Sequence, residues 1–333
     1  MASPIASHAA MTRTAFIKGP VVDAITNRNP LIAAVKSRGK IKKKQGGLTI
    51  RPPAVRYKDP TIQGWDGRNQ MDVVELDLHT YAEHGWVGLV HNWVDNKWDE
   101  LENQGPEALA DEIEENMEAV GQAWMNKFES ILYTDGTSST PVALSGLESF
   151  MKITGTYGGL SQAATDANGL YWWAPTIING GSALTPRTFK TDPRAYLCNL
   201  ANTIGNRQKS SSLTNDAGPD FGLTTQTIWE HIKHYYEQQT HIPMTVSAET
   251  VGMNARMIKA EGMDIYWSRN CTASSFYALS IKDLTFYLQT GDWFATRELK
   301  VNDPIGDLHQ TYFKGQLVTN NPRAHGKITS ITV

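Results

Sequence analysis

Residues 106–132 read PEALADEIEENMEAVGQAWMNKFESIL, and this stretch decides the fold class. Its apolar residues recur at spacings of 4, 4, 3, 4, 4 and 3, which gives one continuous stripe along an α-helix. At 1.5 Å per residue the helix would be about 40 Å long, which is long for a compact domain. We expect its stripe to be buried in a core. The stripe consists of Leu109, Ile113, Met117, Val120, Trp124, Phe128 and Ile131.

A long excursion precedes this helix. Between residues 46 and 94, apolar and polar residues alternate on both sides of a polar, glycine-rich tip at 61–70. The alternation predicts two strands, and the Pro52-Pro53 pair excludes a central position in a sheet. An isolated hairpin is only marginally stable in water, so we expect this one to lie on a partner. Trp65, at the tip, is the predicted anchor, because aromatic residues carry much of the energy of interfaces.

The rest of the chain mixes helices and strands. Residues 1–28 lack a sustained period and are typical of an extended arm, and Asn29-Pro30 is typical of a helix start. A second helix is predicted at 224–241, followed by short strands, and residues 309–333 alternate as long strands do. The sequence therefore predicts an α+β protein.

Charge is unevenly distributed. Residues 1–60 hold 12 basic and two acidic residues, whereas residues 61–135 hold 17 acidic and three basic ones. The whole chain has a net charge of −3, which excludes a wholly basic nucleic-acid binder. Such asymmetry is typical of an interaction surface, although a basic run can also be a solvated terminus.

Two charged sets are candidates for contacts between subunits. The basic set can bind nucleic acid or acidic protein surface, and we favour pairing with acidic helix or hairpin residues, within or between subunits, because complementary patches fix the register of association. The basic set is Lys36, Arg38, Lys40, Lys42, Lys43 and Lys44. The acidic set, on the predicted helix but off its apolar stripe, is Glu107, Asp111, Glu114, Glu115 and Glu118.

Length and composition bound the remaining possibilities. A chain of 333 residues with 40% hydrophobic and 20% charged residues is typical of one large or two ordinary globular domains. It has no apolar run near the roughly 20 residues that span a bilayer, and its first 20 residues lack the pattern of a secretory signal. Two cysteines cannot form a disulfide framework and are typical of a reducing compartment.

Signatures of catalysis are absent from the sequence. It contains no GxSxG, Walker-type, HExxH or CxxC motif. His231 and His234 share a predicted helix with Glu230 and Glu237, but a solvated helix face explains them better than a metal site does. The string GTYGGL at 155–160 favours a tight turn over a phosphate site. We therefore predict no catalytic, cofactor-binding or metal-binding residues, and we interpret the two free cysteines, Cys198 and Cys271, as small buried hydrophobes.

Several strings resemble one known family. They are PLIAAVKSRGKIKKKQGGLTIRPPAVRY (30–57), LYTDGTSSTPVALSGLESF (132–150), and TGTYGGLSQ (154–162) followed by WWAP (172–175). In these strings and in the order of its elements, the chain resembles the major capsid proteins of tailed bacteriophages. Their Hong Kong-type capsid fold is shared with encapsulins. Ala174 departs from the pattern, which has Arg after the paired tryptophans.

The resemblance implies a fold with an N-terminal arm, an extended β-hairpin loop, a peripheral domain built on a spine helix, and an axial domain. The helix at 106–132 would be the spine helix. The implied ranges are 1–30 for the arm, 31–84 for the extended loop and flanking strands, 85–180 for the peripheral domain, 181–290 for the axial domain, and 291–333 for C-terminal strands that return to the peripheral domain.

The implied function is self-assembly, as hexamers and pentamers, into an icosahedral virion shell around double-stranded DNA, built in the host cytoplasm. The implied partners are further copies of the chain, packaged DNA bound without sequence specificity, and scaffolding, portal and decoration proteins, with no membrane. A built-in scaffolding domain is expected to be absent or cleaved. Two alternatives remain: an encapsulin-like cargo shell, and a hydrolase whose site lies in 181–290.

Overall fold

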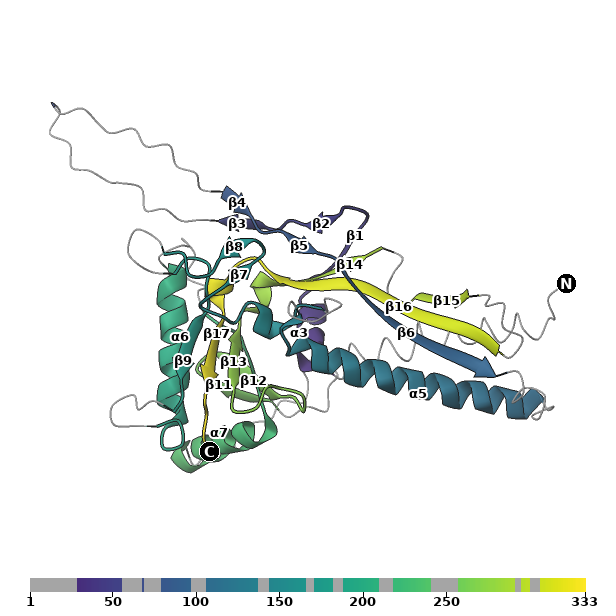
Figure 1. The fold of residues 1–333 in the computed structure, drawn as a ribbon. Coiled ribbons are helices and arrows are strands. Elements are labelled where there is room, and N and C mark those ends of the chain that lie inside the picture. The colour runs from purple at the N-terminus through teal and green to yellow at the C-terminus, as the bar shows by residue number, and fades with distance from the viewer. Residues whose placement is uncertain are drawn as a thin grey trace.

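Figure 1 shows the computed structural model, in which one sheet lies along a long helix and a second sheet lies at one end of this helix–sheet layer. The structure describes residues 29–55, 68, 79–96, 106–136, 144–165, 171–181, 188–209, 218–240, 257–290, 295–299 and 306–333.

The first sheet is organised around one long strand, β16 (Gly306–Thr319). β6 (Val87–Asn96) pairs antiparallel with it along one edge, from Gly315↔Val87 to Gly306↔Asn96. Along the other edge run β14 (Leu284–Gln289) and then β15 (Ala295–Leu299), both antiparallel to β16. β1 (Ile41–Lys44) extends the sheet by pairing parallel with β14.

The helix α5 (Pro106–Leu132) covers one face of this sheet, and it spans the range that the sequence predicts. The Phe128 ring is 1% exposed and lies 5.2 Å from the ring of Phe313 on β16 and 6.1 Å from that of Phe286 on β14. Edge-to-face contacts of this kind add to the free energy of burial. The core of the helix–sheet layer therefore joins one local element to strands about 160–190 residues later in the chain.

The second sheet has six strands and a core of its own. Its order is β11 (Ile258–Ala260), β12 (Met263–Trp267), β10 (Phe221–Thr224), β13 (Phe276–Leu279), β17 (Gly326–Thr329) and β9 (Thr176–Asn179). The helices α6 (Pro193–Lys209) and α7 (Gln226–Thr240) pack against it (Figure 1). Buried apolar residues of both helices, such as Leu200 and Ile232, belong to this core.

The sheets do not follow the boundaries implied at residues 180 and 290. β9 and β17 lie outside 181–290 but complete the second sheet, whereas β14 lies inside that range and belongs to the first sheet. The physical reason is strand pairing: β17 fits between β13, to which it is antiparallel, and β9, to which it is parallel. Chain segments far apart in sequence thus close each sheet.

The excursion begins as two short antiparallel ladders, which we call the loop foot. β2 (Thr49–Ile50) pairs with β5 (His84–Gly85), and β3 (Pro53–Val55) pairs with β4 (His79–Tyr81). The two-strand prediction is right for the foot, but beyond Gly85 the chain leaves the hairpin and joins the first sheet as β6. Trp65 and the rest of the tip, apart from residue 68, lie outside the described residues.

Short elements complete the fold. Asn29 caps α3 (Pro30–Ser37), as the sequence predicts, because its Oδ1 accepts hydrogen bonds from the Leu31 and Ile32 amides at 3.0 and 3.3 Å. The GTYGGL string forms the tight turn expected of it, between β7 (Thr156–Tyr157) and β8 (Leu160–Ser161). Three 3₁₀ turns are η3 (Leu147–Ser149), η4 (Ile281–Asp283) and η5 (Pro322–Ala324).

Candidate assembly surfaces

The basic set spans the end of α3 and the edge strand β1. Lys42 and Lys43 are exposed on β1, the terminal strand of the first sheet. Lys44 is half-buried, and its Nζ donates a hydrogen bond to the Thr49 carbonyl oxygen at 3.3 Å. Lysines on an edge strand also discourage indiscriminate strand pairing. This edge therefore presents positive charge on a fixed backbone.

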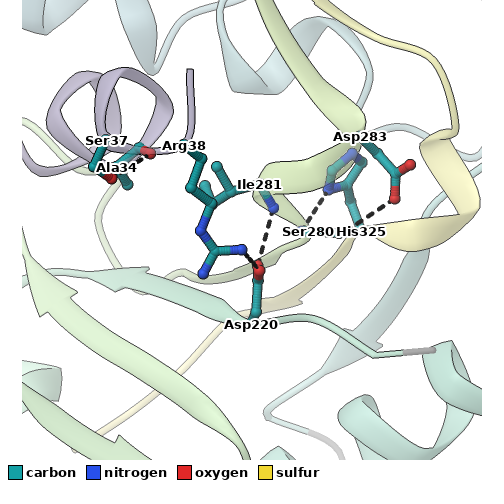
Figure 2. A network of polar contacts seen from close by, with 8 residues as sticks. All are labelled: Ala34, Ser37, Arg38, Asp220, Ser280, Ile281, Asp283 and His325. Atoms are coloured by element: carbon teal, nitrogen blue, oxygen red, sulfur yellow. Dashed lines mark hydrogen bonds and ion pairs between the residues drawn. The ribbon is translucent and has the colours of Figure 1, made fainter. Parts of the chain in front are cut away.

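Arg38 has a different role, because its guanidinium forms an ion pair with Asp220 (Figure 2). The second carboxylate oxygen of Asp220 accepts a hydrogen bond from the Ile281 amide at 2.9 Å. Asp220 directly precedes β10 of the second sheet, whereas η4 leads into β14 of the first. Arg38 thus contacts the junction between the two sheets.

A buried histidine continues this junction. The Ser280 amide donates to His325 Nδ1 at 3.1 Å, and Thr319 Oγ1 lies 2.8 Å from His325 Nε2. Since Nδ1 accepts, Nε2 carries the hydrogen and donates to the threonine. Complete burial lowers the pKa of His325 to about 3, so the imidazole is neutral near pH 7. Figure 2 shows Ser280 and His325 near Arg38 and Asp220.

The acidic set lies on the first half of α5. Glu118 is exposed, and the side chains of Glu107, Asp111, Glu114 and Glu115 lie outside the described residues. Figure 1 shows the first turns of α5 at the outer end of the helix–sheet layer, whereas β1 lies toward the opposite end, near the loop foot. The two charged sets are therefore separated along the length of one chain.

The second half of the apolar stripe is buried in a single copy of the chain. Its described members, Val120, Trp124, Phe128 and Ile131, are between 1% and 7% exposed. The side chains of Leu109, Ile113 and Met117 lie outside the described residues. The buried part of the stripe therefore faces the chain's own sheet.

A buried ionic cluster, which sequence reasoning missed, lies between η3 and the second sheet. The Glu148 carboxylate forms an ion pair with Lys327 and accepts a hydrogen bond from the Tyr277 hydroxyl. That hydroxyl also lies 2.7 Å from Thr272 Oγ1, and the Lys327 ammonium lies 5.1 Å from the centre of the Tyr277 ring. Burial, and next the Glu148 charge, raise the pKa of Tyr277 well above its usual value. The phenol therefore stays protonated and donates.

We expect Lys327→Met to destabilise the fold by about 3 kcal/mol, because it leaves the Glu148 charge buried without its ammonium partner. The side chains of Lys327 and Glu148 are only 10% and 21% exposed. Denaturant unfolding of the monomer measures the loss. Lys259→Met is the matched control, since it breaks an exposed pair with Asp264 and should cost less than about 1 kcal/mol. Equal losses in the two variants would contradict the prediction.

No local signal in the sequence points to these contacts. Lys327 and Glu148 are 179 residues apart, and Arg38 and Asp220 are 182 apart. From the sequence alone, the simplest interpretation of each of these four side chains is a solvated position on the surface. Only the pairing of distant strands brings the two partners of each ion pair together.

The side chains weighed for chemistry are occupied by ordinary contacts. His231 Nε2 lies 3.0 Å from the Lys190 carbonyl oxygen, and His234 Nε2 lies 2.8 Å from Gln238 Nε2. Burial raises the pKa of the Cys271 thiol to about 12, so the thiol is protonated at neutral pH and is a poor nucleophile.

Within the described ranges, no three His, Cys, Asp or Glu side chains gather as metal ligands would. None of the described helices combines the length and hydropathy that crossing a bilayer requires.

The chain was compared with known proteins by sequence and by structure. No protein-family model and no curated protein sequence matches it. The structure of a capsid subunit of cyanophage A-1(L) does match, with a TM-score of 0.66 and 14% identity, over 92% of this chain and 93% of that chain. The chain has the Hong Kong-type capsid fold. The fold that the sequence predicts is thereby confirmed.

Other shells share this capsid fold. The mature capsid of bacteriophage PhiM1 matches with a TM-score of 0.53 at 12% identity, over 88% of this chain and 86% of that chain. An encapsulin complex from Synechococcus elongatus matches with a TM-score of 0.51 at 9% identity, over 90% of this chain and 87% of that chain. The capsid fold of the present chain therefore has relatives in structure among both phage capsids and encapsulins.

Proposed function

We propose that this chain is the major capsid protein of a tailed bacteriophage, a structural protein without catalytic activity. The observation that carries the proposal is the full-length match to the cyanophage capsid subunit, whose TM-score of 0.66 exceeds the 0.51 of the encapsulin. Copies of the chain assemble as hexamers and pentamers into an icosahedral shell around double-stranded DNA. The shell forms in the host cytoplasm, and scaffolding, portal and decoration proteins are its further partners.

In this proposal each part of the fold has an assembly role. Residues 1–30 form an N-terminal arm, and residues 31–84 carry the extended loop that lies on a neighbouring copy. The α5 layer is the peripheral domain. The second sheet, built mainly from 181–290 with β9 and β17 added, is the axial domain near the symmetry axes.

The charged sets pair between copies rather than within one. This step is supported by the position of the two charged sets toward opposite ends of the helix–sheet layer in Figure 1. Of the basic set, Arg38 already forms an ion pair within its own chain, with Asp220. A patch that binds a different patch on the next copy is a heterologous contact, and such contacts close into rings when the rotation fits. The exposed lysines of β1 would then meet the acidic first half of a neighbour's α5.

Changing Lys42, Lys43 and Lys44 together to Gln is expected to lower the yield of empty shells assembled without DNA. Each exposed pair contributes only ~0–1 kcal/mol, but the contact repeats around the shell. The wild-type yield should fall as salt rises, whereas the yield of the variant should depend less on salt because the attraction has already been removed. Light scattering over a salt series measures both.

A charge-matched control changes Lys190, Lys233 and Lys259 to Gln, which removes the same charge from the region of the second sheet. This control should assemble as the wild type does. Unchanged empty-shell assembly of the β1 variant, together with reduced DNA packaging, would reject pairing between copies and favour a lumenal, DNA-facing role.

The decisive experiment on the proposed function is to purify the chain and measure its assembly state. Size-exclusion chromatography and negative-stain microscopy should show megadalton shells or capsomers. A protein that remains monomeric under all assembly conditions and hydrolyses ester or peptide substrates would support the hydrolase alternative. Shells that form readily around a co-expressed protein cargo, without DNA, would support the encapsulin alternative.

A further inference from the structure

The loop foot touches the rest of its own chain at the glycine turn between β7 and β8 (Figure 1). The Glu83 amide donates a hydrogen bond to the Gly158 carbonyl oxygen at 2.8 Å. Gly158 and Gly159 both have positive φ, +60° and +80°, a region that favours glycine. We call residues 155–161 the anchoring turn.

Gly158 is the point of closest approach. A Cβ atom added there would lie 2.7 Å from Ala82 Cβ and 2.8 Å from His84 Nε2, closer than real Cβ contacts come. The same addition at Gly159 would meet nothing within 4 Å. The positive φ favours glycine at both positions. Only at Gly158 does the loop foot also fill the space that a side chain would need.

The anchoring turn is itself held in the core of the helix–sheet layer. Tyr157 is 4% exposed; its hydroxyl accepts a hydrogen bond from the Thr319 amide at 3.0 Å, and its carbonyl oxygen accepts one from Trp173 Nε1 at 2.9 Å. On the other side, the His84 ring lies 4.7 Å from the Tyr157 ring. The turn therefore connects the foot to β16 and to the paired tryptophans.

His84 fits this contact only as a neutral ring. Burial lowers its pKa to about 4, so the imidazole is uncharged at neutral pH. Its charged and titratable neighbours are Tyr157, whose pKa burial raises, and Glu83, which faces solvent in an ion pair with Arg51. The contact between foot and turn is thus apolar in character, apart from the single Glu83–Gly158 hydrogen bond.

The opposite face of the foot is uncovered. Tyr81 is 61% exposed, and the Arg51 and Glu83 side chains, 2.8 Å apart, are 61% and 52% exposed. The buried residues Ile50, Ala82 and His84 all belong to the face on the anchoring turn. Within the described part of one chain, the foot is therefore supported from one side.

From this arrangement we propose that Gly158 is a positioning residue for assembly: the anchoring turn fixes the direction in which the extended loop leaves the body, and thereby whether the loop meets its neighbour. The first half of the proposal concerns a single chain. The second half rests on the proposed shell function. The direction of the loop is set before any neighbour is present, so the foot is ordered in the free subunit.

The test compares Gly158→Ala with Gly159→Ala in the full chain. Both variants place alanine at a positive φ, so backbone strain should lower the unfolding temperature of both, and the collision should lower it further in Gly158→Ala. Only Gly158→Ala should push Ala82 away. Hydrogen exchange on unassembled subunits should then show the amides of 82–84 exchanging about tenfold faster than in Gly159→Ala, because local opening becomes easier. Shell yield should fall in Gly158→Ala and not in Gly159→Ala.

Rescue distinguishes positioning from general damage. Adding Ala82→Gly to Gly158→Ala removes the nearer of the two groups that collide and leaves only the His84 ring, so it should restore part of the protection of 83–84 and part of the shell yield. If Gly158→Ala does not fold, Ala82→Val crowds the same contact from the loop side without changing the turn, and it should give the same local exchange and assembly defect.

The outcomes separate the two halves of the proposal. Equal exchange at 82–84 in the two glycine variants would overturn the anchoring role, whatever the assembly result. Faster exchange with normal shells would overturn the link to assembly. If wild-type subunits never form shells, the proposed function fails, but the exchange comparison still decides whether the turn anchors the foot.

Discussion

Deleting residues 60–70 is expected to leave a folded subunit that no longer assembles into shells. The deletion removes the tip of the excursion, including Trp65, but leaves the paired foot strands at 49–55 and 79–85 intact. Neither described core draws on residues 60–70. Eight of the 11 residues at 60–70 are polar or glycine, so the tip cannot form a core of its own, and we expect its role to come from contacts between copies.

The measurement is shell yield by negative-stain microscopy, alongside the thermal unfolding of the free subunit. Shell yield should fall to the background of the assay, and the unfolding temperature should stay near that of the wild type. Replacing 60–70 by a flexible Gly/Ser linker of equal length tests whether reach alone suffices. Trp65→Ala tests the anchor by itself and should weaken assembly less than the deletion does. Shells of normal diameter from the deletion variant would contradict the prediction.

The structure changes one part of this expectation. Sequence reasoning predicts a loop that is ordered only by a neighbour, because its composition offers little apolar surface. The foot, however, is buried on one side by the anchoring turn of its own chain, through Ala82, His84 and Gly158. The need for a partner therefore applies to the part of the excursion beyond the foot.

Local patterns account for the elements that the sequence predicts well. The stripe of 106–132 depends on residues three or four apart, so periodicity predicts the helix, and the local signals Gly105-Pro106 and Thr134-Asp135-Gly136 place its ends. The cap of α3 depends on Asn29 and the two residues after Pro30, and the glycine turn depends on Gly158 and Gly159. In each case the residues that determine the element lie close to one another in the sequence.

Long-range pairing accounts for what the sequence does not reveal. β1 pairs parallel with β14 across more than 240 residues, and β9 pairs parallel with β17 across about 150. A period-two pattern predicts that a segment is a strand, but not which strand it joins. For the same reason Arg38 could be assigned to a basic surface but not to Asp220, and Glu148 could not be linked to Lys327 at all.

Replacing Trp124 by Ala is expected to give misfolded or aggregated subunits and not merely an assembly defect. In a single chain Trp124 is 4% exposed, and its ring lies 6.4 Å from that of His91 on β6. One turn later, Phe128 packs edge-to-face against Phe286 and Phe313, which stack on each other. Truncating a buried aromatic residue to Ala typically costs ~3–5 kcal/mol, which is a large share of the roughly 5–15 kcal/mol that stabilises a domain.

The cost should be high at this position because the cavity cannot close easily. The described second half of α5 packs against a sheet whose strands are paired on both edges of β16, so we expect that neither the helix nor the sheet moves in to fill the space. Soluble yield and denaturant unfolding measure the effect, and Asn126→Ala, on the exposed side of the same helix, is the control that should remain near wild type. A stable, monomeric Trp124→Ala subunit that fails only at assembly would show that the stripe serves an interface between copies instead of the core of one.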